Sequence, residues 1–562
     1  MNFKTTPFKH QLDEWTFSRE AKARAIFWEQ GTGKSKLTID TAAWMYLKGL
    51  IDAVIVVAPN GVHLNWIEDE LPTHLLDDIA RNTFAHYYQT SKAYNKAHKA
   101  AIKALVNYRG LSWLAISYPG FMTKEGKAAV GSLFEHRKVL YVLDEAHNIK
   151  EPTAARTKSI LKSAKYAPYR RLLTGTPIAQ GAFDLYSQIT FLDAKLWPRN
   201  GLASYTAYKT HFGVFEKTTW NPHAWNAETG ERSGAYISTC VGYRRLNQLT
   251  EMIKDISSRV TKDQVLDLPQ KLYTKRRFEM TPEQARLYND LKNEFMTYVD
   301  SAGDAITQPE VYTPTSICSQ CLGAGEIVDD GFIYPCPACS ADFLTSEIAS
   351  GTLVTAELAI VRLMRLQQIT CGYLPTDDEE EPTHIIPGPN RRLEALVEVV
   401  EATHEKVIVW ARFQLDITLI IKELTARGIK CVRYDGLVDD AERAEAKYLF
   451  KGERPRYDNG QFIGREPIPI AEQARVFVGN PAAGSTGLTL TEAKTVVYYS
   501  NSFKLVDRLQ SEDRAHRIGQ TNNVLYVDII ADGTVDEKIV ESLKSKHSIA
   551  AEILQDKKGD WI

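Results

Sequence analysis

Short apolar runs alternate with helical patterns over the first third of the chain. Runs such as 53–59 are apolar throughout and rich in β-branched residues, which is typical of strands buried on both faces of a parallel sheet. The segments between them, such as 34–49, repeat apolar residues at helical spacing and end at a glycine. Strands that alternate with helices predict right-handed βαβ units. The predicted strands are ARAIFW (23–28), AVIVVAP (53–59), WLAISY (113–118), VLYVLDE (139–145) and RLLTGT (171–176).

The same alternation returns after about residue 390, so the sequence predicts an α/β protein with two parallel-sheet lobes. The chain between these two regions has a more helical pattern. The strands predicted for the second lobe are KVIVWAR (406–412), IKCVRYDG (429–436), ARVFVGN (474–480), TVVYYS (495–500) and VLYVDII (524–530). The predicted domains are a first lobe at 1–280 with a helical insertion at about 200–260, a helical protrusion and linker region at 281–385, and a second lobe at 386–562.

Composition narrows the class of protein. The 562 residues are 44% hydrophobic and 25% charged, as in ordinary globular proteins. The sequence contains neither a run of about 18 apolar residues nor a charged-then-apolar leader, so we expect a cytoplasmic protein that does not cross a membrane. Lys and Arg (68) nearly balance Asp and Glu (70), so any contact with nucleic acid is expected to line a cleft.

The run WEQGTGKS (28–35) follows a predicted strand and precedes a predicted helix, which is the setting of a phosphate-binding loop. Glycines let backbone N–H groups close on a phosphate, Lys34 can reach the β- and γ-phosphates, and Ser35 can hold Mg²⁺. The run departs from the full pattern because Trp28 replaces the first glycine. A chance glycine loop is the alternative. The predicted nucleotide-binding residues of this loop are Gly31, Thr32, Gly33, Lys34 and Ser35.

The run VLYVLDEAH (139–147) brings two adjacent carboxylates to the end of a predicted strand, where ligands bind in open α/β sheets. Asp144 is expected to bind the Mg²⁺ that Ser35 touches, and Glu145 to orient and deprotonate the attacking water. By itself such a pair could form an ordinary solvated turn. Beside a phosphate loop it predicts an ATPase.

Four of the seven cysteines form two C-x₂-C pairs. Each pair can direct two thiolates at one ion, and four thiolates complete a tetrahedral zinc site with no open position for chemistry. We therefore predict a structural Zn²⁺ element at 311–345. Reduced cysteines without a ligand and redox pairs are the alternatives. The predicted zinc ligands are Cys318, Cys321, Cys336 and Cys339.

The run DRLQSEDRAHRIGQ (507–520) places several polar residues on one face of a predicted helix. A solvated helix face is the first interpretation of such a cluster. The alternative is that its two arginines face a negatively charged group. The residues on this face are Gln510, Asp513, Arg514 and Arg517.

Taken together, these motifs resemble a known family. DEAH (144–147) with LTGTPI (173–178), and then the run 483–520, is similar to the Snf-type (sucrose-nonfermenting) family of ATP-driven DNA translocases in helicase superfamily two. FKHQ (8–11), VLDLPQK (265–271) and LMRLQQITCGYL (363–374) also resemble family motifs. Two departures are AQG (179–181), where the family has asparagines, and AAGSTG (482–487), where it has a glycine pair. Both departures bear on how ATP hydrolysis is coupled to DNA rather than on hydrolysis itself.

The resemblance implies two RecA-like parallel-sheet lobes with helical insertions, and the cysteine pairs add a small zinc-binding element between them. It implies ATP and Mg²⁺ as cofactors. It places Phe8 and Gln11 against the adenine, makes Arg514 and Arg517 arginine fingers, and lets Gln510 help to fix them. The expected partner is duplex or branched DNA. The chain looks most like compact bacterial or phage members, so we expect a monomer in the cytoplasm of a bacterial cell or a phage-infected host.

Two other functions fit part of this pattern. A strand-separating DNA or RNA helicase also carries DEAH, although RIGQ (517–520) and the LP-x-K run (268–271) favour the duplex translocase. A non-catalytic scaffold that binds nucleic acid is the alternative outside the enzymes. A pseudo-enzyme is expected to lose at least one catalytic residue, whereas Lys34, Asp144 and Glu145 are all present.

Overall fold

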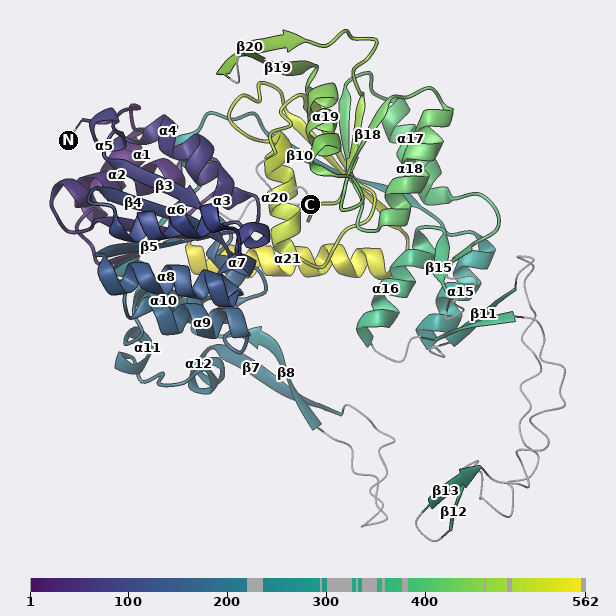
Figure 1. Ribbon diagram of the computed structural model, residues 1–562. Coiled ribbons are helices and arrows are strands. Elements are labelled where there is room, and N and C mark those ends of the chain that lie inside the picture. The colour runs from purple at the N-terminus through teal and green to yellow at the C-terminus, as the bar shows by residue number, and fades with distance from the viewer. Residues whose placement is uncertain are drawn as a thin grey trace. The chain divides into compact units, whose positions relative to one another are not determined.

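The computed structural model describes residues 2–219, 236–293, 296–300, 326–329, 332–335, 351–355, 359–376, 383–458, 461–482 and 488–556 (Figure 1). The chain divides into two compact units. Unit 1 comprises residues 1–274, 405–527 and 539–562, and unit 2 comprises residues 275–404 and 528–538. Within the described ranges, no helix combines the length and the apolar character needed to cross a membrane.

The first sheet of unit 1 has seven strands in the order β3-β4-β2-β5-β6-β1-β9, and every neighbouring pair is parallel. The five strands predicted for this region are confirmed. The additional strands β3 and β9 are half-buried and partly polar, so they lack the continuous apolar run that marks the others. The strands are β1 (Ala23–Trp28), β2 (Ala53–Ala58), β3 (Thr83–Tyr87), β4 (Leu111–Ser117), β5 (Val139–Asp144), β6 (Tyr169–Leu173) and β9 (Ser257–Val260).

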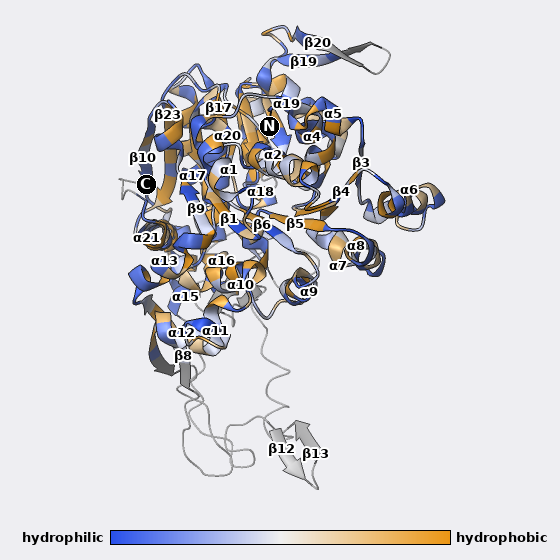
Figure 2. Ribbon diagram, turned by 90° about the vertical axis from the view of Figure 1, so that its left-hand side faces the viewer, coloured by the Kyte–Doolittle hydropathy of each residue, from blue (hydrophilic) through white to orange (hydrophobic). Residues whose placement is uncertain are grey.

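Both faces of this sheet are buried, which explains the continuous apolar runs. Along β1, Ala25 and Phe27 belong to one hydrophobic cluster, whereas Ile26 and Trp28 belong to another. Figure 2 shows β4 and β5 as strongly hydrophobic strands. The helices around the sheet are α1 (Lys9–Ser18), α2 (Lys34–Leu47), α3 (Val62–Asn65), η1 (Trp66–Glu70), α4 (Leu71–His74), α5 (Asp77–Ala80), η2 (Thr90–Lys92), α6 (Lys96–Asn107), α7 (Tyr118–Met122), α8 (Lys124–His136), η3 (Ala146–Ile149), α9 (Ala155–Ala164), η4 (Ala182–Asp184), α10 (Leu185–Leu192) and α11 (Leu196–Arg199).

The region predicted as a helical insertion at about 200–260 contains helices and a hairpin. The antiparallel strands β7 (Gly213–Thr219) and β8 (Tyr236–Tyr243) form the hairpin. The domain boundaries drawn from the sequence stay a prediction. The helices here are α12 (Tyr205–Phe212), α13 (Leu246–Ile253), η5 (Lys254–Ile256) and, just after β9, α14 (Lys262–Val265).

The second sheet has the strand order β10-β23-β22-β17-β21-β18. Strand β17 pairs in parallel with β21 and β22, and β18 pairs in parallel with β21. The prediction of an α/β protein with two parallel sheets is therefore confirmed. The strands are β10 (Lys271–Phe278), β17 (Lys406–Trp410), β18 (Cys431–Tyr434), β21 (Val476–Gly479), β22 (Ala493–Tyr498) and β23 (Val524–Ala531). The helices are α18 (Gln414–Ala426), α19 (Asp440–Lys451), α20 (Leu505–Ala515) and α21 (Val535–Leu554), and β19 (Glu453–Asp458) pairs in antiparallel orientation with β20 (Gln461–Pro467).

Unit 2 is organised around a buried arginine. The Arg392 guanidinium donates hydrogen bonds to the Thr370 carbonyl (3.1 Å) and hydroxyl (2.8 Å) and pairs with Asp536. The helices of this part are α15 (Pro282–Asn293), α16 (Ala359–Thr370) and α17 (Arg391–Glu401). The strand pairs are β11 (Met296–Asp300) with β14 (Gly351–Thr355), β12 (Glu326–Asp329) with β13 (Phe332–Pro335), and β15 (Tyr373–Pro375) with β16 (Thr383–Ile385).

Two features of the sequence fall outside the described residues. The first is the set of predicted zinc ligands, Cys318, Cys321, Cys336 and Cys339, and the second is the run 483–487. In the part of the chain that is described, no group of three or more His, Cys, Asp or Glu side chains is arranged to hold a metal ion. The zinc element stays a prediction.

Candidate active site

The phosphate loop lies between β1 and α2, as the sequence predicts. Gly31 and Gly33 have φ angles of 80° and 85°, in the left-handed region that favours glycine. A Cβ atom on Gly33 would lie 1.9 Å from Gln11 Nε2, so the close approach of Gln11 also requires glycine. No side chain caps the start of α2, so its first N–H groups can bind a phosphate.

Lys34 points back into this loop. Its Nζ atom donates hydrogen bonds to the carbonyl oxygens of Trp28 (2.9 Å) and Glu29 (3.1 Å). Burial lowers the pKa of Lys34, and the charges of Glu145 and Asp144 oppose this shift. The ammonium group is therefore held by neutral acceptors in the field of two carboxylates, at a place where it can reach a bound phosphate.

Asp144 and Glu145 follow one another at the C-terminal end of β5. Burial and the charge of Glu145 raise the pKa of Asp144, although its Oδ2 atom accepts a hydrogen bond from Trp66 Nε1 at 2.9 Å. Burial has the same direction of effect on Glu145, but a hydrogen bond and the charge of His147, together with Lys34, outweigh it and lower the pKa of Glu145. The pKa values of the two adjacent carboxylates are thus shifted in opposite directions, which is a common property of catalytic pairs.

Glu145 is held by three neighbouring side chains. Gln30 Nε2 (3.2 Å) and Thr174 Oγ1 (3.4 Å) donate hydrogen bonds to its carboxylate, and His147 Nδ1 lies 3.3 Å from Oε2. Its backbone adopts φ 50°, a strained conformation for a residue other than glycine and one that is found mostly at functional sites. Gln30 and His147 were not predicted, although each lies inside one of the two motifs at 28–35 and 139–147.

Ser35 and Asp144, the Mg²⁺ ligands predicted from sequence, both lie near Glu70, a carboxylate that was not predicted. Glu70, the last residue of the π-helix η1, lies near Ser35 and Asp144, and both act on its pKa. Burial and the charge of Asp144 raise the pKa of Glu70 to about 7. Mg²⁺ prefers oxygen ligands, and nucleotide sites supply one or two carboxylates with the rest from phosphate and water. The oxygen atoms of Ser35 and Asp144 fit such an ion, because the neighbouring carboxylates make this region favourable for a cation.

Arg514 and Arg517 lie close to these residues in unit 1. A Cβ atom on Gly31 would lie 3.8 Å from Arg517 Cγ, so this side chain packs against the phosphate loop. Arg517 Nη1 donates a hydrogen bond to Thr489 Oγ1 (3.1 Å), and Arg514 Nη1 to the Leu488 carbonyl (3.3 Å). Burial lowers the pKa of Arg514 to about 10, which leaves the side chain charged at neutral pH.

The helix that was predicted to carry both arginines is shorter than predicted and contains only Arg514. Helix α20 ends at Ala515, and His516 already has non-helical backbone angles. Arg517 therefore does not share a helix face with Gln510, Asp513 and Arg514. The departure is at His516, which has φ −95° and ψ 82° and whose carbonyl accepts a hydrogen bond from Lys262 Nζ (2.8 Å). Gln510 itself is buried on α20.

Phe8 and Gln11 lie at the N-terminal side of the loop. Gln11 Oε1 accepts a hydrogen bond from the Phe8 backbone N–H (2.8 Å), and Gln11 Nε2 donates to the Gly33 carbonyl (3.2 Å). The Phe8 ring is 52% exposed and stacks on His10, with the ring centroids 5.8 Å apart. An exposed aromatic ring beside an amide that is tied to the phosphate loop suits a purine base. The roles of both residues stay predictions.

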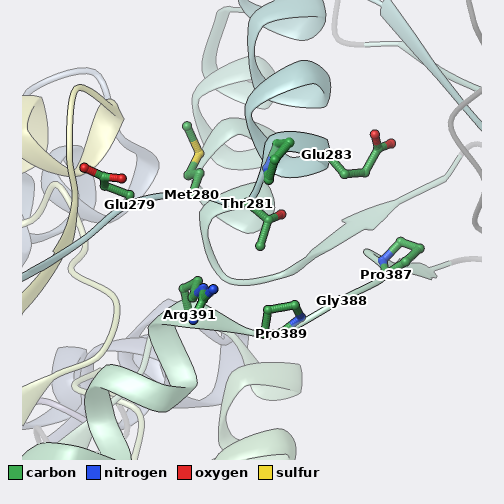
Figure 3. A pocket seen from close by; sticks show the side chains of 9 residues that line it. Glu279, Met280, Thr281, Glu283, Pro387, Gly388, Pro389 and Arg391 are labelled. Atoms are coloured by element: carbon green, nitrogen blue, oxygen red, sulfur yellow. The ribbon is translucent and has the colours of Figure 1, made fainter.

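The cavity in Figure 3 belongs to unit 2 and has a volume of about 690 Å³. None of its lining residues is a predicted site residue. They are Glu279, Met280, Thr281, Pro282, Glu283, Pro387, Gly388, Pro389 and Arg391.

A phosphate loop, a strand-end acidic pair and two arginines beside them, in a chain with two parallel sheets, are typical of the nucleotide-binding α/β proteins. Within that class, residues 9–321 match the SNF2-related domain. The chain belongs to the SNF2-related family.

Individual relatives are distant and longer than this chain. The transcription regulatory protein SNF2 of Saccharomyces cerevisiae is 23% identical over 539 residues, with 95% of this chain and 26% of that protein covered. The DNA excision repair protein ERCC-6-like of Danio rerio is 23% identical over 548 residues, with 95% and 34% covered. The SWI2/SNF2 ATPase core of Sulfolobus solfataricus in complex with dsDNA is 20% identical, with 98% of this chain and 93% of that chain covered and a TM-score of 0.36.

Proposed function

We propose that the chain is an ATP-dependent DNA translocase, a motor that hydrolyses ATP when it binds duplex DNA and remodels DNA structures or displaces bound protein. The observation that carries the proposal is the position of Arg514 and Arg517 beside the phosphate loop. These arginines come from the second-sheet region, whereas Lys34 and Glu145 come from the first. A site that needs both regions can be switched by a ligand that aligns them, and family membership favours DNA as that ligand.

In this proposal the residues of the first-sheet region bind the phosphates and Mg²⁺ and activate the attacking water. Lys34 and the N-terminus of α2 bind the β- and γ-phosphates, while Ser35 and Asp144 hold Mg²⁺. When bound, this ion neutralises charge that develops on the phosphate oxygens. Glu145, which readily ionises, accepts a proton from the attacking water, and its contacts with Gln30 and Thr174 fix its direction.

The remaining site residues stabilise the charge of the γ-phosphate and recognise the base. Arg514 and Arg517 are placed to stabilise the negative charge of the γ-phosphate as arginine fingers. Phe8 stacks on the adenine and Gln11 reads its edge, so that base recognition is linked through the Gly33 carbonyl to the phosphate loop.

ATP hydrolysis measured with duplex DNA, single-stranded DNA, RNA and no nucleic acid tests this proposal. We expect slow turnover alone and the largest stimulation by duplex DNA. The strongest stimulation by single strands or RNA favours the strand-separating helicase, and equal rates in all four conditions contradict the translocase. Absence of turnover with retained DNA binding identifies the non-catalytic scaffold.

The finer predictions belong to the same proposal. We propose that the motor is a monomer and that it acts in the cytoplasm of a bacterial cell or a phage-infected host. Branched DNA is proposed as one of its substrates. The two C-x₂-C pairs support a structural Zn²⁺ site at Cys318, Cys321, Cys336 and Cys339. Elemental analysis of protein purified without chelator is expected to give one zinc per chain, and metal-free protein contradicts the site.

A further inference from the structure

Lys262 connects the phosphate loop to the segment that carries the two arginines. It is the first residue of α14, directly after β9 and Thr261, and it is only 4% exposed. Its backbone N–H donates a hydrogen bond to Glu29 Oε2 at 2.8 Å. Its Nζ atom donates to Asp513 Oδ1 at 2.6 Å and to the His516 carbonyl at 2.8 Å. One residue thus binds both parts of the site.

At the phosphate-loop end, Lys262 binds the residue that anchors the loop. The Glu29 carbonyl accepts hydrogen bonds from Lys34 Nζ (3.1 Å) and from Thr32 Oγ1 (2.7 Å). The Glu29 carboxylate also lies 3.3 Å from Arg259 Nη2. A shift of Lys262 therefore acts on the backbone that positions Lys34.

At the other end, Lys262 binds the residues that directly precede the two arginines. Asp513 precedes Arg514, and His516, whose carbonyl accepts the second hydrogen bond, precedes Arg517. His516 directly follows the last residue of α20, so this bond holds the chain at the point where it turns out of the helix, just before Arg517. A buried ammonium group is costly unless strong acceptors surround it. Here the acceptors are the two positions that set where the arginines point.

We propose that Lys262 is a positioning residue that holds Arg514 and Arg517 at the distance from the phosphate loop that the transition state requires. This inference rests on the proposed ATPase function and deepens it, since it names the link between the two halves of the site. In this role Lys262 acts through Glu29 on one side and through Asp513 and His516 on the other.

The test compares a transition-state analogue with a ground-state ligand. In Lys262→Met, we expect ADP with aluminium fluoride to bind about 100-fold more weakly, because a misplacement of about 1 Å has effects of this size, while the affinity for ADP alone stays within about threefold. A purely structural role weakens both ligands alike and lowers the melting temperature, and that result contradicts the proposal. Lys494→Met, which removes an ion pair with Glu405 (2.8 Å), is the matched control and is expected to change neither affinity.

A second variant keeps the test informative if Lys262→Met does not fold, since that change leaves Asp513 without its nearest cation. Lys262→Met/Asp513→Asn removes both charges and is expected to fold and to show the same selective loss of aluminium fluoride binding. Wild-type affinity for the analogue in this variant overturns the proposal. The binding measurements are independent of DNA, so a wild type that DNA does not stimulate refutes the translocase and leaves the role of Lys262 separately testable.

Discussion

Helices α2 and α20 deliver the two halves of the candidate site, and they are fixed by different forces. Helix α2, which follows the phosphate loop, packs through buried apolar residues that include Leu37, Ile39 and Met45, and its buried Lys36–Asp40 ion pair (2.7 Å) lies within the helix itself. Helix α20 instead buries charged and polar side chains, among them Arg508, Glu512 and Arg514. Apolar packing tolerates small shifts, whereas a hydrogen-bonded ion network has one favoured geometry.

The network around α20 centres on Glu512, whose side chain is fully buried. Its carboxylate accepts hydrogen bonds from Arg508 Nε (2.8 Å), Lys271 Nζ (3.0 Å) and the Tyr273 hydroxyl (2.9 Å). The Arg508 guanidinium lies over the Tyr498 ring, 3.5 Å from its centroid. The helix that carries Arg514 is thus tied to β10 and β22. The geometry of the arginine half therefore depends on buried charged contacts from distant parts of the sequence.

The largest effect is expected from the arginine half. Arg517→Ala should lower the rate of ATP hydrolysis by about 10³- to 10⁵-fold, the range for arginine fingers, because the developing charge loses its partner. Nucleotide affinity should change far less. DNA-stimulated turnover and nucleotide binding, measured on the same preparation, check this.

Arg427→Ala is the matched control for this substitution. Arg427 forms an exposed ion pair with Glu423 (2.8 Å) just after α18, and its removal is expected to leave turnover unchanged. Turnover within about tenfold of wild type in Arg517→Ala would show that Arg517 is not an arginine finger, since it falls outside the range for such residues.

The same contrast explains what the sequence could and could not predict. The phosphate loop and β5 with its acidic pair were predictable because each is one contiguous pattern. Glu70 and Lys262 were not, since neither belongs to a local motif and their partners Ser35 and Asp513 are distant in the chain. The end of α20 was misplaced because the chain leaves the helix at His516, whose carbonyl binds Lys262, a residue distant in the chain.

A smaller effect is expected in the phosphate-binding half. Glu145→Gln should slow turnover by about 10²- to 10⁴-fold, the usual contribution of a general base, while ATP binding persists because Lys34 and the loop are unchanged. Glu135→Gln, at an exposed position on α8, is the control and should behave as wild type. Single-turnover hydrolysis distinguishes slow chemistry from slow product release. A rate within about tenfold of wild type assigns the base to another group.

The smallest effect concerns the stability of the arginine half as pH falls. Burial disfavours ionised Glu512, but Lys271 and Arg508 outweigh it and lower the pKa from 4.5 to about 2. Because the folded pKa lies below the unfolded one, Glu512 stabilises the fold above about pH 4.5, and this contribution is lost as pH falls towards 2. The shift corresponds to roughly 3 kcal/mol at neutral pH.

Glu512→Gln should therefore melt several degrees below wild type at pH 7, and the difference should shrink as the pH is lowered through 4.5, because protonated Glu512 resembles glutamine. Glu251→Gln, which removes an exposed pair with Lys254, should show a small difference at every pH. Melting temperatures of wild type, Glu512→Gln and Glu251→Gln, measured from pH 7 to below pH 4.5, test this prediction. A constant difference between Glu512→Gln and wild type would mean that the carboxylate charge does not hold α20, and that this helix is fixed by packing just as α2 is.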